Sequence, residues 1–458
     1  MGKYFGTDGF RGEVNRTLTA MHAYQIGRFL GWYFATPLSG TSKGHKPRLV
    51  IGKDTRLSGY MFEYAIGAGI TASGADAYLL HVTTTPCVSF VTAQEDFDCG
   101  IMISASHNPF CDNGIKLVNR HGEKIDDATI DLIEAYLDGN LSALGIEDDL
   151  PLATGAEVGR IVDYAVGRNR YIGYLISLAS HSFKGKRIGL DCANGSAWWI
   201  AKAVFDALGA KTYLLHAEPN GLNINQNAGS THIEGLKKFV VENNLDAGFA
   251  YDGDADRCLA VDELGNLING DQILYIFAAQ AQKTANFSGK VVATVMSNMG
   301  LFKSLEQLGI EYEITRVGDR YVYEKMVENN HMIGGEQSGH IILRKYATTG
   351  DGILTSIMLT EAMIDQKASL FHLAKPMEIY PQVLVNLRVE DKDRIMDHPA
   401  VQASVKAAEE LLAGSGRVLL RKSGTEPVIR VMAEASTHEL CNDAVELICR
   451  VILENASH

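Results

Sequence analysis

Three stretches of the chain repeat one plan, in which a short apolar strand is followed by an amphipathic helix, a glycine and a second short strand. The first strands cover residues 48–54, 186–192 and 290–296, and the second strands cover residues 76–80, 211–215 and 311–316. Each stretch predicts a βαβ unit, whose crossover is right-handed and whose sheet is covered on both faces. Because 458 residues are too many for one hydrophobic core, we expect three similar α/β domains.

A further strand follows each unit and stops in an unusual loop. These strand-and-loop segments are residues 98–108, 246–257 and 331–340. Open α/β sheets bind ligands at the carboxyl ends of their strands. The sequence therefore predicts that each of the three domains directs one loop towards a ligand.

The end of the chain follows a different pattern. Strands are expected at residues 382–389 and within 416–435, and helices at residues 400–412 and 438–454. This order predicts a small α+β domain. The predicted fold is α/β, with three similar mixed α/β domains (1–165, 166–265 and 266–378) and a smaller α+β C-terminal domain (379–458).

The acidic composition restricts the partners of the protein. The chain has 42 lysines and arginines against 55 aspartates and glutamates, a net charge of −13, which argues against nucleic acid or an anionic membrane as the partner. An anionic substrate would need a local cationic pocket. The seven cysteines contain no CxxC pair, and neither a leader nor a long apolar run is recognised, so we expect a cytoplasmic protein.

The first loop lies within GIMISASHNPFCDNGIK, residues 100–116. Its apolar beginning predicts a buried strand that ends at small and polar residues. Ser106 is expected on a tight turn, where Pro109 prevents a helix and Gly114 permits a positive φ. Lys116 brings a cation close to the serine. Such a loop could also be a plain connection between two elements.

The second loop carries three alternating carboxylates, Asp252, Asp254 and Asp256. Carboxylates this close repel one another unless a cation lies among them, and all-oxygen ligands suit Mg²⁺ or Ca²⁺. An EF-hand would need a glycine at the sixth position, which is Arg257, and helices where strands are expected here. A solvated acidic turn is the other interpretation, but the apolar strand before the loop favours a metal site.

The third loop, GGEQSGH, presents Glu336 and Ser338 at alternate positions of a glycine-rich turn. A carboxylate and a hydroxyl suit a pair of sugar hydroxyl groups, and the glycines permit a close approach. Arg320 lies on a turn before this loop, where a surface role is equally open. Arg11, among the glycines of FGTDGFRGEVN, offers a planar fork for phosphate, although these residues also fit a plain turn.

A cluster of hydroxyl groups, backbone donors and guanidinium groups marks the C-terminal domain. Such a nest binds phosphate well, whereas the alternative is an exposed hairpin turn with incidental basic residues. The members of the cluster are Arg421, Ser423, Gly424, Thr425 and Arg430.

Four motifs, SASHNP, DGDADR, GGEQSGH and SGTEP, occur in this order at domain spacing. On these motifs the chain resembles, over essentially its whole length, the α-D-phosphohexomutase family, whose members have three related α/β domains and a smaller fourth. The resemblance implies that Ser106 is phosphorylated in the active protein. It also implies that one Mg²⁺ per chain is held by the Ser106 phosphoryl group, Asp252, Asp254 and Asp256.

The same resemblance implies roles for the other residues of these motifs. The residues expected to be catalytic are Ser106, Lys116, Arg257 and His107. The residues expected to bind substrate are Arg11, Arg320, Glu336, Ser338, Arg421, Ser423, Gly424, Thr425 and Arg430.

The reaction implied by the resemblance is the movement of a phosphoryl group between two positions of a sugar. GEQSG is similar to the amino-sugar branch of the family, which interconverts glucosamine 6-phosphate and glucosamine 1-phosphate through a phosphoserine and a bisphosphate intermediate. A hexose 1,6-bisphosphate is expected as activator and a homodimer as assembly. Glucose or mannose phosphates are the alternative substrates. A sugar-phosphate sensor without turnover and a metal-dependent sugar phosphatase are the alternative functions.

Overall fold

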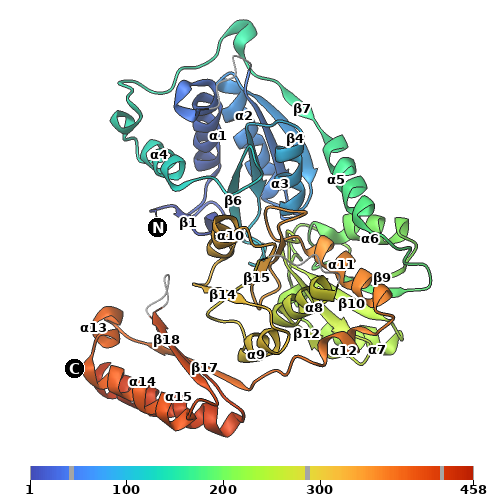
Figure 1. Ribbon diagram of the computed structural model, residues 1–458. Helices are drawn as coiled ribbons and strands as arrows, with labels where there is room; N and C mark the ends of the chain where they lie inside the picture. The colour runs from blue at the N-terminus through green and yellow to red at the C-terminus, as the bar shows by residue number, and fades with distance from the viewer. Residues whose placement is uncertain (1, 41–45, 284–288, 423–427, 457–458) are drawn as a thin grey trace. The chain divides into compact units, whose positions relative to one another are not determined.

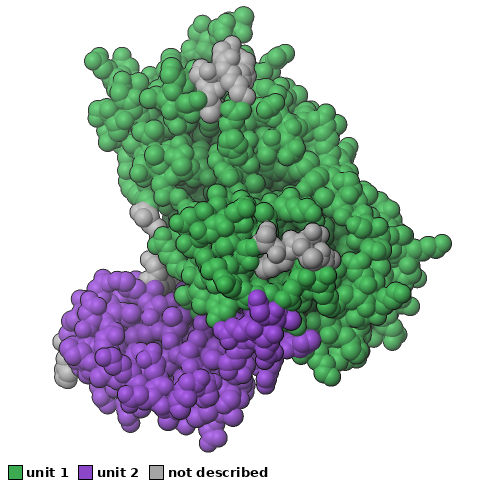
Figure 2. Space-filling model, viewed as in Figure 1, with its two compact units in different colours: residues 1–296, 310–375 green, residues 297–309, 376–458 purple. Residues whose placement is uncertain are grey.

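The computed structural model describes residues 2–40, 46–283, 289–422 and 428–456. The chain divides into two compact units (Figure 2), of which the first contains residues 1–296 and 310–375 and the second contains residues 297–309 and 376–458. Within the described ranges, no helix is both long and apolar enough to cross a membrane.

The N-terminal sheet of the first unit, of which Figure 1 labels β1, β4, β6 and β7, has the strand order β1-β2-β6-β5-β3-β4-β7. Strand β3 pairs in parallel with β4 and β5, whereas β6 pairs antiparallel with β5 and β2. The strands are β1 (Phe5–Gly6), β2 (Gly9–Glu13), β3 (Arg48–Lys53), β4 (Asp76–Val82), β5 (Cys99–Ile103), β6 (Asp112–Asn119) and β7 (Ile161–Asp163). The helices are α1 (Ala20–Ala35), α2 (Gly59–Ala72), α3 (Thr85–Gln94) and α4 (Asp127–Leu137), with short 3-10 helices η1 (Pro37–Ser39), η2 (Leu141–Leu144) and η3 (Gly155–Glu157).

The middle sheet of the first unit has the strand order β12-β11-β10-β8-β9. Strands β8, β9 and β10 are parallel, and β11 pairs antiparallel with β10 and β12. The strands are β8 (Arg187–Asp191), β9 (Lys211–Leu215), β10 (Ala247–Tyr251), β11 (Cys258–Asp262) and β12 (Leu267–Ile268). The helices are α5 (Ala165–Leu178), α6 (Ala197–Ala207), η4 (Gly229–Thr231) and α7 (Glu234–Glu242).

The third sheet of the first unit has the strand order β14-β13-β15-β16. Strand β13 pairs in parallel with β14 and β15, and β15 pairs antiparallel with β16. The strands are β13 (Val291–Thr294), β14 (Tyr312–Thr315), β15 (Ile333–Gly335) and β16 (Ile341–Leu343). The helices are α8 (Gly270–Lys283), α10 (Asp319–Glu328), α11 (Gly352–Asp365) and α12 (Leu370–Ala374).

The second unit is built on an antiparallel sheet with the order β17-β19-β18. Its strands are β17 (Gln382–Arg388), β18 (Arg417–Lys422) and β19 (Val428–Glu434). Its helices are α9 (Met299–Gln307), α13 (Lys392–Met396), α14 (Pro399–Leu412) and α15 (His438–Ala456). Apolar residues of α14, α15 and β19 form its core, among them Val401, Val431 and Ile448.

The predicted repeat is confirmed, and it extends to the loops. In each of the three sheets of the first unit, a parallel centre is followed by an antiparallel pair, β5–β6, β10–β11 or β15–β16. Each of the three motif loops connects the two strands of one such pair. The predicted α+β order of the C-terminal part is also confirmed. The boundaries at residues 165, 265 and 378 stay a prediction, and β12 lies just beyond the second of them.

Two local interpretations are corrected by the backbone. Gly114 is not among the residues with a positive φ. It lies in β6, where a β-carbon would come within 2.4 Å of the Ser104 carbonyl oxygen. Arg11 does not lie in a plain turn, because it belongs to β2 and is paired with Gly114 across the sheet. Glycine is therefore required at position 114 by close backbone packing and not by a left-handed conformation.

Glycines determine how closely α1 and α2 pack. A β-carbon at Gly27 would lie 2.3 Å from the carbonyl oxygen of Ile66, and one at Gly69 would lie 2.2 Å from that of Tyr24. Both glycines are buried. The two helices therefore meet backbone to backbone, and neither position accepts a larger side chain without movement of a helix.

Gly27→Ala is expected to lower the free energy of unfolding by about 1–3 kcal/mol, because the methyl group overlaps a backbone oxygen of α2. The matched control is Gly173→Ala in α5, where a β-carbon would meet no atom of the described residues within 4 Å. This control should raise the free energy of unfolding by up to about 1 kcal/mol. Urea unfolding followed by circular dichroism measures both effects. Equal stability of the two variants would contradict the backbone contact.

Candidate active site

Ser106 lies in the turn between β5 and β6, and its side chain is buried. Its φ of +51° is left-handed, a conformation that costs a non-glycine residue of the order of 1–3 kcal/mol and therefore needs enforcement by its surroundings. Its backbone N–H donates to the Ser104 hydroxyl at 2.9 Å. Its hydroxyl donates to Oδ2 of Asp252 at 2.6 Å. The first and second motif loops therefore meet at this hydrogen bond.

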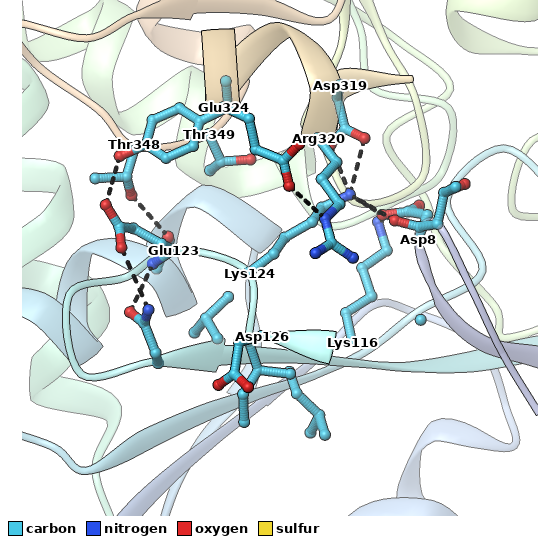
Figure 3. Close-up of a pocket in the computed structure, with 18 of the residues that line it drawn as sticks. Asp8, Lys116, Glu123, Lys124, Asp126, Asp319, Arg320, Glu324, Thr348 and Thr349 are labelled. Carbon is cyan, nitrogen blue, oxygen red and sulfur yellow. Dashed lines mark hydrogen bonds and ion pairs between the residues drawn. The ribbon is translucent and has the colours of Figure 1, made fainter. Parts of the chain in front are cut away.

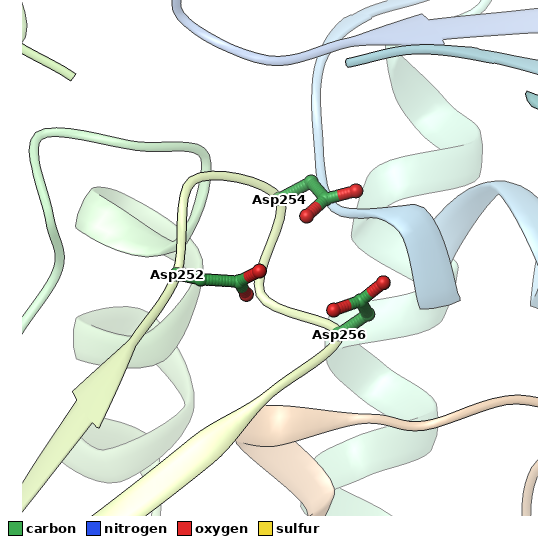
Figure 4. Close-up of side chains that lie close together, drawn as sticks. All are labelled: Asp252, Asp254 and Asp256. Carbon is green, nitrogen blue, oxygen red and sulfur yellow. The ribbon is translucent and has the colours of Figure 1, made fainter. Parts of the chain in front are cut away.

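Asp252, Asp254 and Asp256 occupy the turn between β10 and β11 (Figure 4). All three side chains are buried. One oxygen from each lies within 4.8 Å of the others, so the three carboxylates surround one space. We call this group the aspartate cluster.

Three helices begin next to the turn that carries the aspartate cluster. Residues at the starts of α6, α3 and α11 donate their N–H groups to three successive carbonyl oxygens of the turn. The pairs are Ser196 to Gly253 at 2.8 Å, Thr85 to Asp254 at 3.0 Å and Gly352 to Ala255 at 2.9 Å. Because the N-terminus of a helix stabilises nearby negative charge, these helices both fix the turn and offset the repulsion among its carboxylates.

Lys116, on β6, brings positive charge to the aspartate cluster. Its Nζ lies 2.8 Å from Oδ2 of Asp254, and 3.2 Å from Oδ2 of both Asp256 and Asp8. Burial opposes the charge of this lysine, but the carboxylates of Asp254, Asp8 and Asp256 outweigh burial and raise the pKa of Lys116 well above its usual value. Lys116 is therefore an ammonium ion at neutral pH.

The aspartate cluster carries more negative charge than Lys116 offsets. Burial, and then the charges of Asp256 and Asp254, raise the pKa of Asp252 well above its usual value. Oδ1 of Asp254 and Oδ1 of Asp256 are buried without a hydrogen-bond partner among the described residues. Such oxygens are costly to bury, and carboxylate oxygens are the ligands that Mg²⁺ takes in proteins. The cluster therefore fits a divalent cation.

His107 and Arg257 lie next to Ser106. Nη1 of Arg257 is 3.0 Å from Nδ1 of His107, and Oγ of Ser106 is 3.5 Å from the same nitrogen. Burial, and then the charges of Arg257 and Arg11, lower the pKa of His107 to about 4. His107 is therefore neutral at pH 7 and accepts a hydrogen bond from Arg257 at Nδ1.

A cavity of about 780 Å³ opens beside the aspartate cluster (Figure 3). Asp256 of the cluster and its ion-pair partner Lys116 both line this cavity. Lys124 lies between Asp8 at 3.0 Å and Asp319 at 2.7 Å, and so joins the N-terminal sheet to α10. The volume is typical of sites for small molecules.

Three of the predicted substrate residues come from the third sheet and α10. Arg320 lines the cavity, and its guanidinium group is paired with Asp127. Glu336, in the turn between β15 and β16, accepts a hydrogen bond from the Gly318 N–H at 2.9 Å. Ser338 is exposed in the same turn. The structure therefore places Arg320 at the cavity, where the carboxylates of Asp127 and Glu324 both pair with its guanidinium group.

Two of the predicted phosphate residues are neighbours in the second unit. Arg421 on β18 lies directly opposite Arg430 on β19. Burial, and then the charge of Arg430, lower the pKa of Arg421. Adjacent guanidinium groups repel each other and attract an anion. Ser423, Gly424 and Thr425 lie outside the described residues.

Comparison with known proteins places the chain in a family. Domain models named phosphoglucomutase/phosphomannomutase match in order, with α/β/α domain I at residues 2–143, domain II at 169–265, domain III at 269–380 and the C-terminal domain at 384–451. A phosphoglucosamine mutase of Lachnospira eligens is 60% identical over 456 residues, which cover 99% of this chain and 98% of that protein. The chain belongs to the phosphoglucomutase/phosphomannomutase family.

Solved structures with similar folds match this chain over nearly its whole length. A phosphoglucomutase/phosphomannomutase family protein from Burkholderia thailandensis matches with a TM-score of 0.80 at 24% identity, covering 100% of this chain and 98% of that chain. The N-acetylphosphoglucosamine mutase of Aspergillus fumigatus, solved in complex with GlcNAc-6P and magnesium, matches with a TM-score of 0.70 at 16% identity, covering 99% and 96% of the two chains. At these identities the likeness shows the shared fold.

Some residues that build this phosphoglucomutase/phosphomannomutase site are not singled out by the sequence pattern. Asp8 pairs with Arg11, Lys116 and Lys124. The hydroxyl of Thr85 donates to the aspartate cluster. Asp8 has a signal, because it stands between glycines near Arg11. Lys124 and Thr85 have none, since an isolated lysine or threonine is usually a surface residue.

We expect Mg²⁺ to raise the melting temperature, because a cation bound to the folded aspartate cluster stabilises it by about 2.7 kcal/mol when free Mg²⁺ is 100 times Kd. Asp254→Asn should remove most of this rise. Asp262→Asn is the matched control, because Asp262 is buried in the same hairpin but accepts hydrogen bonds from Leu264 and Asn266. Scanning fluorimetry with Mg²⁺ or a chelator measures the rise. A rise of equal size in all three proteins would place the cation elsewhere.

Proposed function

We propose that this chain is a phosphoglucosamine mutase, which interconverts glucosamine 6-phosphate and glucosamine 1-phosphate. The observation that carries the proposal is the buried hydroxyl of Ser106, 2.6 Å from Asp252 of the aspartate cluster. The name of the Lachnospira eligens relative, which is 60% identical over 99% of this chain, supports glucosamine as the sugar. GEQSG at residues 335–339 supports the same choice.

In the proposed reaction, phosphoserine 106 gives its phosphoryl group to the O1 hydroxyl of glucosamine 6-phosphate. The bond from phosphorus to Oγ breaks, a bond from phosphorus to O1 forms, and the O1 proton passes to the serine oxygen. The glucosamine 1,6-bisphosphate then turns over in the site. Its 6-phosphoryl group returns to Oγ, the O6 oxygen takes up the proton, and glucosamine 1-phosphate is released.

Four residues are proposed to carry out the transfer. Phosphoryl transfer depends mainly on positioning and on neutralisation of charge. Ser106 carries the phosphoryl group, while Lys116 and Arg257 offset its negative charge as cations. His107 is neutral at pH 7, so its proposed role is to orient Arg257 through the hydrogen bond at Nδ1.

The proposed ligands of one Mg²⁺ are Asp252, Asp254, Asp256 and the phosphoryl group of Ser106. When bound, Mg²⁺ supplies positive charge that neutralises phosphoryl oxygens. Two buried carboxylate oxygens that have no hydrogen-bond partner in the described part of the chain support this assignment. The magnesium in the complex of the Aspergillus fumigatus protein supports it as well.

The remaining predicted residues are proposed to hold the substrate. Glu336 and Ser338 bind sugar hydroxyl groups, Arg320 binds at the cavity, and Arg11, which is paired with Asp8, binds phosphate. For Arg320, binding requires that Asp127 and Glu324 give up their ion pairs. The phosphate that is not being transferred is assigned to Arg421, Ser423, Gly424, Thr425 and Arg430.

An activator, an oligomeric state and a location in the cell are also proposed for the protein. A hexose 1,6-bisphosphate serves as activator, because it can phosphorylate Ser106 by the same chemistry that completes the reaction. The resemblance to the family supports a homodimer. The cysteines, none of which is disulfide-bonded in the described residues, support the cytoplasm as the location.

Phosphorus NMR of the purified protein with Mg²⁺ and a trace of hexose 1,6-bisphosphate tests the function. We expect glucosamine 6-phosphate to yield glucosamine 1-phosphate faster than glucose or mannose 6-phosphate yields its own 1-phosphate. Ser106→Ala should abolish the reaction, because no oxygen remains to carry the phosphoryl group. The control Ser177→Ala, at an exposed serine of α5, should retain full activity.

Each other outcome of this experiment has a definite meaning. A faster reaction with glucose or mannose phosphate would keep the mechanism and change the substrate. Release of inorganic phosphate alone would support a phosphatase. No reaction, together with binding that survives in Ser106→Ala, would support a sensor.

Arg421→Gln is expected to raise KM for glucosamine 6-phosphate by about 10-fold or more, because it removes a charge-assisted hydrogen bond to phosphate. Lys422→Gln is the matched control. Lys422 is the next residue of β18, points to the opposite face of the sheet and pairs with Asp393. Initial-rate kinetics measure both variants. Equal effects on KM would indicate a general loss of positive charge instead of a phosphate site.

A further inference from the structure

Arg56 lies just before α2 and is completely buried. The roles proposed above do not use this residue. A buried guanidinium group is unfavourable unless its charge and its N–H groups are all satisfied. The hydrogen-bond acceptors of Arg56 therefore indicate which part of the structure it stabilises.

All five N–H groups of the Arg56 guanidinium have acceptors. Nε donates to Oδ2 of Asp54 at 2.9 Å. The four others donate to backbone carbonyl oxygens of the β5–β6 turn, which carries Ser106, and of the first residue of β6. These acceptors are Ser106 at 3.0 Å, Asn108 at 2.8 Å, Asp112 at 3.1 Å and Pro109.

Two further groups hold the same turn. Nδ2 of Asn225 donates to the carbonyl oxygens of Ser106 at 2.8 Å and Asn108 at 3.0 Å. Oδ2 of Asp54 also accepts from the Ser104 hydroxyl at 2.7 Å, and that hydroxyl accepts from the Ser106 N–H. Arg56 therefore holds the peptide groups on both sides of Ser106, directly at its carbonyl and through Asp54 at its N–H.

We propose that Arg56 is the positioning residue for the phosphorylated serine, because it fixes the left-handed backbone of Ser106 through the carbonyl groups of its turn. Arg56 does not touch the Ser106 hydroxyl in the structure. Its charge is balanced by Asp54, so its contribution is geometric.

Lysine cannot replace Arg56, because an ammonium group has three N–H donors where the planar guanidinium has five. In Arg56→Lys, at least two of the present acceptors lose their donor, and the turn can relax from its strained conformation. The phosphoryl group would then be displaced from the aspartate cluster. A displacement of about 1 Å can reduce the rate of a positioned reaction about 100-fold.

The chain offers a matched control in Arg28, which is also buried. Arg28 donates to the carbonyl oxygens of Ala72, Leu150 and Pro151 and to the hydroxyl of Ser73. These acceptors lie at the C-terminal end of α2, whereas Arg56 lies before its N-terminal end. Because α2 has 14 residues, about 21 Å of helix separates the two sites. Arg28→Lys is thus the same chemical change, away from Ser106.

The experiment compares kcat, KM and melting temperature of the wild-type, Arg56→Lys and Arg28→Lys proteins, with glucosamine 6-phosphate, Mg²⁺ and hexose 1,6-bisphosphate. Arg56→Lys should lower kcat about 100-fold while KM changes by less than about threefold, since the substrate residues are untouched. Arg28→Lys should lower the melting temperature by a similar amount and keep kcat within about twofold of wild type. A loss of kcat in Arg56→Lys no larger than in Arg28→Lys would overturn the proposal.

A second variant keeps the proposal testable if Arg56→Lys does not fold. Asn225→Ala removes two donors to the same turn and should lower kcat about 10-fold. A wild-type kcat in Asn225→Ala would then refute positioning of the turn by these donors.

The kinetic test of Arg56 rests on the proposed function. A separate measurement therefore distinguishes a failure of the proposed function from a failure of the role proposed for Arg56. Phosphorus NMR follows the formation of phosphoserine from hexose 1,6-bisphosphate alone. If the wild-type protein forms phosphoserine but no glucosamine 1-phosphate, the proposed function fails. Slower formation in Arg56→Lys than in Arg28→Lys would still support the role of Arg56. Equal rates would refute it.

Discussion

The turn between β10 and β11 is the constraint on which the rest of the first unit depends. It places three carboxylates in one buried space, where mutual repulsion and loss of water both oppose folding. Helices that follow strands of all three sheets, α3, α6 and α11, each bind one carbonyl group of this turn. The site therefore forms only when the three sheets have assembled, and no single repeat could hold the carboxylates alone.

Charges alternate from the aspartate cluster to the cavity wall. Asp256, Lys116, Asp8, Lys124 and Asp319 form one continuous series of ion pairs. The inner members of this series each have at least two partners of opposite charge, which is how buried charges are tolerated. An anionic substrate therefore meets cations that are already paired, in a chain of net charge −13. Binding then depends on the geometry of these groups more than on the overall charge.

The repeat and the three motif loops could be read from the sequence, because apolar strands and glycine-rich turns are local patterns. The three aspartates were also recognisable, since alternating carboxylates after a buried strand are unusual. Arg56 and Lys124 could not be recognised, because their importance comes from partners distant in the sequence. The need for glycine at position 114 has a related origin, because only the folded sheet brings in the carbonyl oxygen that excludes a β-carbon.

The backbone of Ser106 restricts which amino acid can stand there. Serine and threonine both carry a hydroxyl group that accepts a phosphoryl group, and they often replace each other in proteins. A residue with two substituents on its β-carbon, however, is a marked outlier in the left-handed region, where Ser106 lies with a φ of +51°. Threonine at this position would therefore be strained by its backbone, although the chemistry alone would allow it.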